Sequence, residues 1–108
     1  MNERAKAILH FWFNESSMDQ RFSYNAEFDQ KIKEKFFLDY QKAINNKYDE
    51  WQNHAKECLA LIIMLDQFSR NLFRNNSKAF VMDAKARLIA NEAIDRAYIE
   101  KLSTDEIL

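Results

Sequence analysis

Apolar residues recur at helical spacing in four stretches of the chain, near positions 4–13, 26–45, 53–73 and 77–97. The second stretch is the most regular, because an apolar or aromatic side chain returns every four residues: Phe28, Ile32, Phe36, Tyr40 and Ile44. Such spacing places these side chains on one face of a helix. The pattern therefore predicts about four helices, and the short connections between them favour antiparallel neighbours.

Asparagine, aspartate and serine stand between these stretches, and the chain contains no glycine and no proline. Hairpin turns and bulges rely on those two residues, so extensive β structure is not expected. Asn25 is placed to cap the helix over 26–45, and Asn45 and Asn46 are placed to end it, because asparagine tolerates left-handed backbone. The predicted fold class is all-α, built of antiparallel helical hairpins.

The third stretch is apolar on every side from Cys58 to Leu65. A helix of this kind is normally buried, yet only three other helices, one of them short, are predicted to cover it. We therefore expect an exposed apolar groove through which the chain self-associates or binds a protein helix. The run is far shorter than the roughly 20 residues that span a bilayer, so no membrane partner is expected.

The chain of 108 residues is long enough for one domain only. Its 16 basic and 17 acidic residues leave a formal charge of -1, which gives no field to attract nucleic acid. The N-terminus shows no secretory signal, and the single cysteine, Cys58, has no partner for a disulfide. These features predict a cytoplasmic protein that binds neither nucleic acid nor membrane.

The last residues form a pattern that opens a helix. Ser103 and Glu106 stand at the spacing of a capping box, and Ile107 and Leu108 follow directly. The sequence stops before that helix makes one turn. We therefore expect residues 1–108 to be a single helical domain that is the N-terminal portion of a longer one.

The segment LALIIMLDQFSRNLFR at 59–74 resembles the signature of domain of unknown function family 924, an uncharacterised, largely bacterial family. HFWF at 10–13 is similar to the family's Asp-Phe-Trp-Phe opening, and further matches follow along the chain: Phe28, Asp29, Trp51, Ala79, Phe80 and Asp83. The most specific element is LDQFSRN at 65–71. The resemblance covers nearly the whole chain and implies a tetratricopeptide-like, right-handed array of helical hairpins with no established activity.

The chain departs from the family pattern at three positions and in length. His10 stands where the family usually has Asp, Asn14 where it often has Gly, and Ser69 where its signature usually has Pro. Family members are also longer, and they continue with a Phe-Leu-Tyr-Leu-Pro-Phe-Glu-His segment and a later helix rich in Arg and His. A family site that needs those groups would be incomplete here.

Five polar side chains follow the apolar run of the third helix and form the candidate site: Asp66, Gln67, Arg70, Asn71 and Arg74. Residues four apart on a helix share a face. As a ligand site, the two guanidiniums and an amide would grip a carboxylate or phosphate while Asp66 orients Arg70. The structural alternative is that Asp66 and Arg70 form an ordinary, partly buried ion pair and the two amides satisfy loop carbonyls.

Other candidates for chemistry are weaker. Glu50, His54 and Glu57 would align only if the third helix began early, and the chain has no His-Glu-x-x-His or Glu-x-x-His pair of the kind that builds metal sites. Cys58 has no histidine nearby to activate it, and apolar neighbours raise the pKa of a thiol. No catalytic residue, metal or cofactor is predicted.

Two functions are compatible with these patterns. The favoured one is a non-enzymatic module that binds a protein or peptide, because stacked helical hairpins present concave surfaces. The alternative is an enzyme or small-anion binder in which the five-residue cluster recognises the ligand and Asp66 orients it or acts as a base. That activity would be lost if it needs the later family segments.

Overall fold

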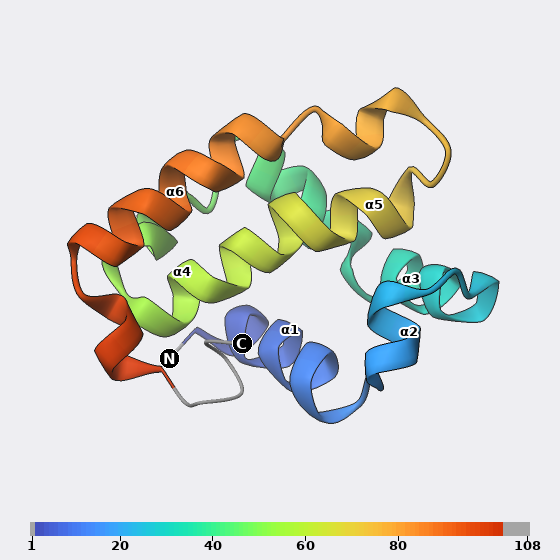
Figure 1. Ribbon diagram of the computed structural model, residues 1–108, viewed down its shortest axis with the longest axis horizontal. Helices are drawn as coiled ribbons and strands as arrows, with labels where there is room; N and C mark the ends of the chain where they lie inside the picture. Colours follow the sequence, from blue (N-terminus) through green and yellow to red (C-terminus); the bar gives the residue numbers. More distant parts are fainter. Residues whose placement is uncertain (1, 103–108) are drawn as a thin grey trace.

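The protein is helical throughout the part of the chain that the structure describes (Figure 1). The structure is a computed structural model that describes residues 2–102, apart from the side chains of Phe22 and Ile99. Its α-helices are α1 (Glu3–Asn14), α2 (Met18–Phe22), α3 (Ala26–Ile44), α4 (Ala55–Ile62), α5 (Ser69–Leu72) and α6 (Asp83–Asp95). Shorter elements are the 3-10 turns η1 (Asp49–Asn53), η3 (Ser77–Phe80) and η4 (Tyr98–Lys101) and the π-helical turn η2 (Ile63–Phe68).

The all-α prediction is confirmed, since residues 2–102 contain no strand. The capping box predicted at Ser103 and Glu106 lies outside the described residues. The best-defined prediction, the helix over 26–45, matches α3. The Asn25 side chain accepts a hydrogen bond of 2.9 Å from the backbone N–H of Phe28. At the other end Asn46 takes a left-handed conformation with φ of 65°.

The polar segment after α1 contains a helix that the apolar pattern did not indicate. Ser17 and Gln20 form a reciprocal capping box, in which each side chain accepts a hydrogen bond from the other residue's backbone N–H, at 3.1 and 2.9 Å. This box starts the five-residue helix α2. A helix this short has too few apolar positions to show a period, so only its cap identifies it.

The central helix of the fold, residues 55–72, is formed by α4, η2 and α5 in direct succession. Contacts to α1 come from α4, contacts to α3 come from η2 and α5, and α6 runs along α4 and η2 on another side (Figure 1). Its apolar run is consequently buried at these positions: Cys58, Ala60, Leu61, Ile63, Met64 and Leu65. The prediction of a buried helix is confirmed. The bare groove expected over the same residues is wrong, because α1, α3 and α6 cover them.

Aromatic side chains from three helices form the centre of the core. The Phe11 ring lies 5.4 Å from Phe28 and 5.3 Å from Phe36, measured between centroids, and Phe68 stacks on Phe36 at 5.5 Å. All four are at most 3% exposed. Aromatic pairs at these separations add to the stabilisation from burial alone. Phe68 therefore fixes the middle of the central helix against α1 and α3.

The C-terminal helix begins later than the sequence indicates. The apolar pattern predicted one helix over 77–97, but Ser77–Phe80 forms a separate 3-10 turn and α6 starts at Asp83. Asn75 has φ of 62°, and the Asn76 side chain accepts a hydrogen bond from the backbone N–H of Lys78. These two residues reverse the chain. Phe80, which the apolar pattern included in that helix, lies in the 3-10 turn instead and is 59% exposed.

Large exposed apolar side chains occur on several elements in the described part of the chain: Met18, Tyr24, Leu38, Phe80, Val81, Leu88 and Ile94. They come from α2, α3, α6 and the connections between helices, so they form no groove along the central helix. Over residues 2–102, no helix has both the length and the apolar character needed to cross a membrane.

Candidate functional site

The five predicted site residues lie where the central helix ends. Asp66 and Gln67 belong to the π-helical turn η2 and Arg70 and Asn71 to α5, and Arg74 lies two residues beyond the end of α5. A π turn widens the helix and shifts its backbone hydrogen bonds. Arg70 Nη1 donates to the backbone carbonyl of Asp66 and, at 2.7 Å, to its carboxylate Oδ1. The guanidinium thus holds both the side chain and the backbone of the wide turn.

Arg70 has a second carboxylate partner on another helix. Its Nη2 donates to Oδ2 of Asp83, the first residue of α6, at 3.2 Å. The guanidinium carbon also lies 5.3 Å from the centre of the Phe80 ring, within cation–π range. The side chains of Arg70 and Asp66 are 37% and 33% exposed. The predicted partly buried Asp66–Arg70 pair is therefore confirmed, and Asp83 extends it to α6.

Arg74 and Asn71 both turn to Asp29 in the first turn of α3. Arg74 donates from Nε to Oδ2 at 2.7 Å and from Nη2 to Oδ1 at 3.0 Å, and Asn71 Nδ2 donates to Oδ1 at 2.9 Å. The hydrogen bonds to Asp29 raise the pKa of Arg74. The Tyr24 ring completes the environment, with its centre 4.9 Å from the guanidinium carbon.

The five residues therefore belong to two separate ion-pair groups, one around Arg70 and one around Arg74, and do not surround a single ligand position. The expected contacts between the amides and loop carbonyls are wrong, because Asn71 donates to Asp29 and Gln67 Nε2 donates to Asp66 Oδ2 at 2.6 Å. Among the matches to the family pattern were Asp29 and Asp83, but the spacing within the third helix could not pair them with the arginines. Asp29 precedes Arg74 by 45 residues, so only the packing of α3 brings them together.

Two adjoining hollows open beside these arginines. One, of about 490 Å³, is lined by Arg70, Arg74, Asn75, Asn76, Ser77, Ala79 and Phe80. The other, of about 280 Å³, is lined by Tyr24, Ala26, Asp29, Gln30, Lys33, Asn71, Leu72, Arg74 and Asn75. Both include Arg74 and Asn75. We call the residues that border this region the Arg74 surface: Tyr24, Arg70, Arg74, Asn75, Ser77 and Phe80.

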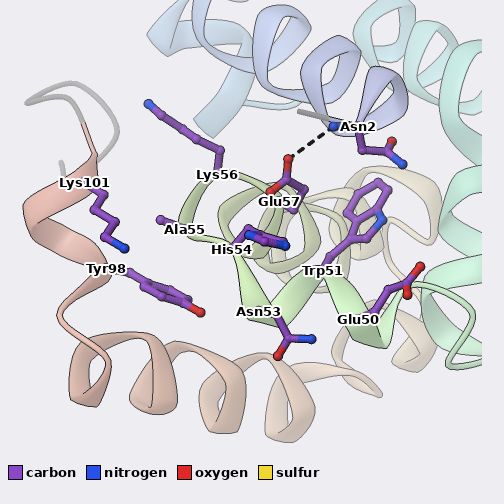
Figure 2. Close-up of a pocket in the computed structure, with 10 residues that line it drawn as sticks. All are labelled: Asn2, Glu50, Trp51, Asn53, His54, Ala55, Lys56, Glu57, Tyr98 and Lys101. Atoms are coloured by element: carbon purple, nitrogen blue, oxygen red, sulfur yellow. Dashed lines mark hydrogen bonds between the residues drawn. The ribbon is translucent and has the colours of Figure 1, made fainter.

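A wider cleft of about 680 Å³ lies at the other end of the central helix (Figure 2). Its lining mixes carboxylates with amines: Glu50, Glu57, Lys56 and Lys101. Glu57 Oε1 accepts the backbone N–H of Asn2 at 3.2 Å, so this buried carboxylate is engaged in holding the N-terminal segment. The mixed charges of this lining favour no single class of ligand.

The metal half-site considered at the same cleft does not form. Helix α4 begins at Ala55, and His54 takes an extended conformation as its N-cap. Figure 2 shows Glu50 pointing away from His54 and Glu57 directed to Asn2. Across residues 2–102, no group of three or more His, Cys, Asp or Glu side chains is arranged to hold a metal ion.

Cys58 is buried in the core, where it is 2% exposed. Burial raises the pKa of its thiol to about 11, as its apolar neighbours led us to expect. A thiol with so high a pKa is almost entirely protonated at neutral pH, and the thiolate is the reactive form. Cys58 is therefore a packing residue.

The family model of bacterial proteins of unknown function, DUF924, matches residues 8–107 of the chain. The chain belongs to this family. The resemblance carried by the LDQFSRN segment is thereby confirmed. A solved structure of a protein of unknown function from Agrobacterium tumefaciens superposes with a TM-score of 0.88 at 34% sequence identity.

That match covers 95% of this DUF924 chain and 58% of the Agrobacterium protein. The chain thus spans less than two thirds of the length of its solved relative. Comparison with curated proteins gives no significant match. The relatives therefore establish the family and the helical fold, and the function has to be argued from the site.

Proposed function

We propose that this DUF924 chain is a binding module for a peptide segment of a protein partner, and that the Arg74 surface is the binding site. The observation that supports this most is a pair of exposed aromatic rings beside guanidiniums. Tyr24 is 69% exposed beside Arg74, and Phe80 is 59% exposed beside Arg70. Tyrosine, phenylalanine and arginine are enriched where protein interfaces gain their affinity.

The arginines of this surface are held in place before any partner arrives. Asp29 fixes Arg74 through two hydrogen bonds, and Asp66 and Asp83 fix Arg70 from two helices. A side chain that is already ordered loses little entropy on binding, which favours affinity. The aromatic rings in turn lie against these fixed groups, so the surface presents a defined shape with two hollows.

A small-anion binder, the alternative function, is less favoured by this geometry. Three aspartates already pair with the two guanidiniums, so a free anion meets a largely neutralised site. A peptide gains additional contact area on Tyr24 and Phe80, which a small anion leaves uncovered. The proposal includes no catalytic step. The cytoplasmic location and the tetratricopeptide-like order of hairpins stay predictions.

Selection from a library of random displayed peptides tests the proposal. Peptides selected on the wild-type chain should lose about fivefold or more in affinity for Phe80→Ala and for Tyr24→Ala, since truncating an interface anchor costs about 1 kcal/mol or more. The matched control is Leu38→Ala, because Leu38 is 73% exposed on α3 and lies outside both hollows. It should leave affinity unchanged. A selection in which no peptide depends on Phe80 or Tyr24 would overturn the proposed function.

A further inference from the structure

The Arg74 guanidinium keeps one edge without a protein partner. A guanidinium has five N–H groups. Asp29 takes the Nε group and one of the two on Nη2. Within residues 2–102, the remaining Nη2 hydrogen and both Nη1 hydrogens have no acceptor. One hydrogen of Nη1 and the remaining hydrogen of Nη2 lie along the Nη1–Nη2 edge, which matches the two oxygens of a carboxylate.

We propose that the peptide recognised by the Arg74 surface is acidic, and that one of its carboxylates binds this edge of Arg74 in the 490 Å³ hollow. The inference rests on the proposed function and specifies its ligand. The carboxylate belongs either to an Asp or Glu side chain or to the C-terminus of the partner, since both present the same two oxygens.

The lining of this hollow offers hydrogen-bond donors to a carboxylate. It contains two guanidiniums and no acidic side chain, because Asp29, Asp66 and Asp83 contact the arginines without lining the hollow. The other polar groups are the Ser77 hydroxyl and the amides of Asn75 and Asn76, which can donate hydrogen bonds. Several donors thus converge where an acidic group would sit.

Arg70 supports this site without being its anchor. Its Nη1 donates twice to Asp66 and its Nη2 donates to Asp83, so both ends of its fork are engaged. Arg74 is engaged along one edge only. Arg70 orders Phe80, whose ring offers an apolar surface to the residue next to the bound carboxylate.

A titration followed by nuclear magnetic resonance tests the inference with three probes: acetyl-Glu-Phe-amide, acetyl-Gln-Phe with a free C-terminus, and acetyl-Gln-Phe-amide. At least one of the two probes that carry a carboxylate should bind about tenfold more tightly than the neutral one, as expected of charge-assisted hydrogen bonds. Binding should shift the backbone amide signals of Asn75, Ser77 and Phe80. The tighter of the two acidic probes identifies the source of the carboxylate.

The Arg74→Lys variant keeps the positive charge and loses the two-pronged edge, so it should remove the advantage of the acidic probes. Arg87→Lys is the matched control, because Arg87 is an exposed arginine of α6 outside both hollows. Ser77→Ala offers a second test on an exposed residue whose replacement leaves the core intact. It should weaken the acidic probe by about two- to threefold, the loss of one hydrogen bond partly compensated by water.

The outcomes separate the two proposals. Equal binding of all three probes at the hollow would overturn the acidic ligand and leave the peptide-binding surface standing. If no probe binds at concentrations up to about 10 mM, the weak end of measurable affinity, the acidic ligand is likewise overturned. Selected peptides that depend on Phe80 but carry no Asp, Glu or free C-terminus would also exclude an acidic ligand, while supporting the proposed function.

Discussion

Each end of α3 carries an arginine–aspartate ion pair, and the two pairs have similar surroundings. Asp39, near the C-terminal end, binds Arg4 at 2.6 Å, and Asp29, near the N-terminal end, binds Arg74 at 2.7 Å. In both pairs an uncharged side chain donates a further hydrogen bond to the aspartate, from Tyr48 at 2.6 Å and Asn71 at 2.9 Å. Each guanidinium also lies near an aromatic ring, that of Phe36 or Tyr24.

The pairs differ in what remains available after they form. Arg4 Nη2 donates to the carbonyl of Lys35 as well as to Asp39, and the Asp39 side chain is only 7% exposed, so this carboxylate is enclosed. Arg74 lines two hollows and keeps one edge open. The same residue types thus fasten two helices at one end of α3, and at the other end also present a donor edge to solvent.

The largest effect should follow from removing the enclosed carboxylate. Asp39→Ala leaves Tyr48 and Arg4 without their acceptor, and we expect it to lower the free energy of unfolding by about 2–3 kcal/mol. The loss stays below that of a fully buried pair because the Arg4 side chain is 49% exposed and can be hydrated. Asp29→Ala should cost about 1–2 kcal/mol. Urea unfolding monitored by circular dichroism measures both, and equal losses would remove the distinction between the two ends.

A smaller loss of stability should appear at alkaline pH, and of the two ion pairs on α3 only the one at Asp39 should contribute to it. Burial and the hydrogen bond to Asp39 raise the pKa of Tyr48. In the unfolded chain tyrosine ionises near pH 10. Below that pH both states keep the phenolic proton and stability is unaffected. Above it the unfolded state loses its proton first, so the free energy of unfolding should fall as pH rises.

The Tyr48→Phe variant should lose about 1 kcal/mol at neutral pH, the net contribution of one hydrogen bond, and should show a shallower fall above about pH 10. Part of the fall must persist, because burial also raises the pKa of Tyr40 and raises that of Cys58 from 9.0 to about 11. Asn71→Ala is the control at the Asp29 end, since an amide does not titrate. An alkaline slope that Asn71→Ala reduces and Tyr48→Phe does not would contradict the assignment.

The smallest effect should come from the exposed ring at the Asp29 end. Tyr24→Leu removes a cation–π contact to Arg74 but little buried area, so we expect a stability loss of about 0.5 kcal/mol or less. Thermal unfolding of the variant beside the wild type is the measurement. A loss above about 1.5 kcal/mol would mean that Tyr24 is held in the structure by packing and is not available for a partner.

Local information was enough to predict most of the fold. The four-residue period and the Asn25 cap located α3, and the run from Cys58 to Leu65 indicated the buried central helix. The apolar period gave a wrong start for the C-terminal helix, which was predicted over 77–97 and begins at Asp83. Phe80 continued the pattern of the following helix, but it belongs to the separate 3-10 turn η3, which ends before α6 begins at Asp83, and it is exposed.

The candidate site was predictable only within one helix. Asp66 and Arg70 are four residues apart, a separation at which helix geometry alone brings side chains together. The pairing of Asp29 with Arg74 depends on the angle at which α3 crosses the central helix, and no sequence spacing encodes that angle. The division of the five residues into two groups was missed for the same reason.

The π-helical turn at Ile63–Phe68 gives the chain one place where its length can change without disturbing the helix on either side. A π turn takes up an extra residue, so the flanking segments keep the orientation of a continuous α-helix. A residue gained or lost within α4 would instead rotate everything that follows by about 100°. Arg70 and Arg74 would then face away from Asp83 and Asp29.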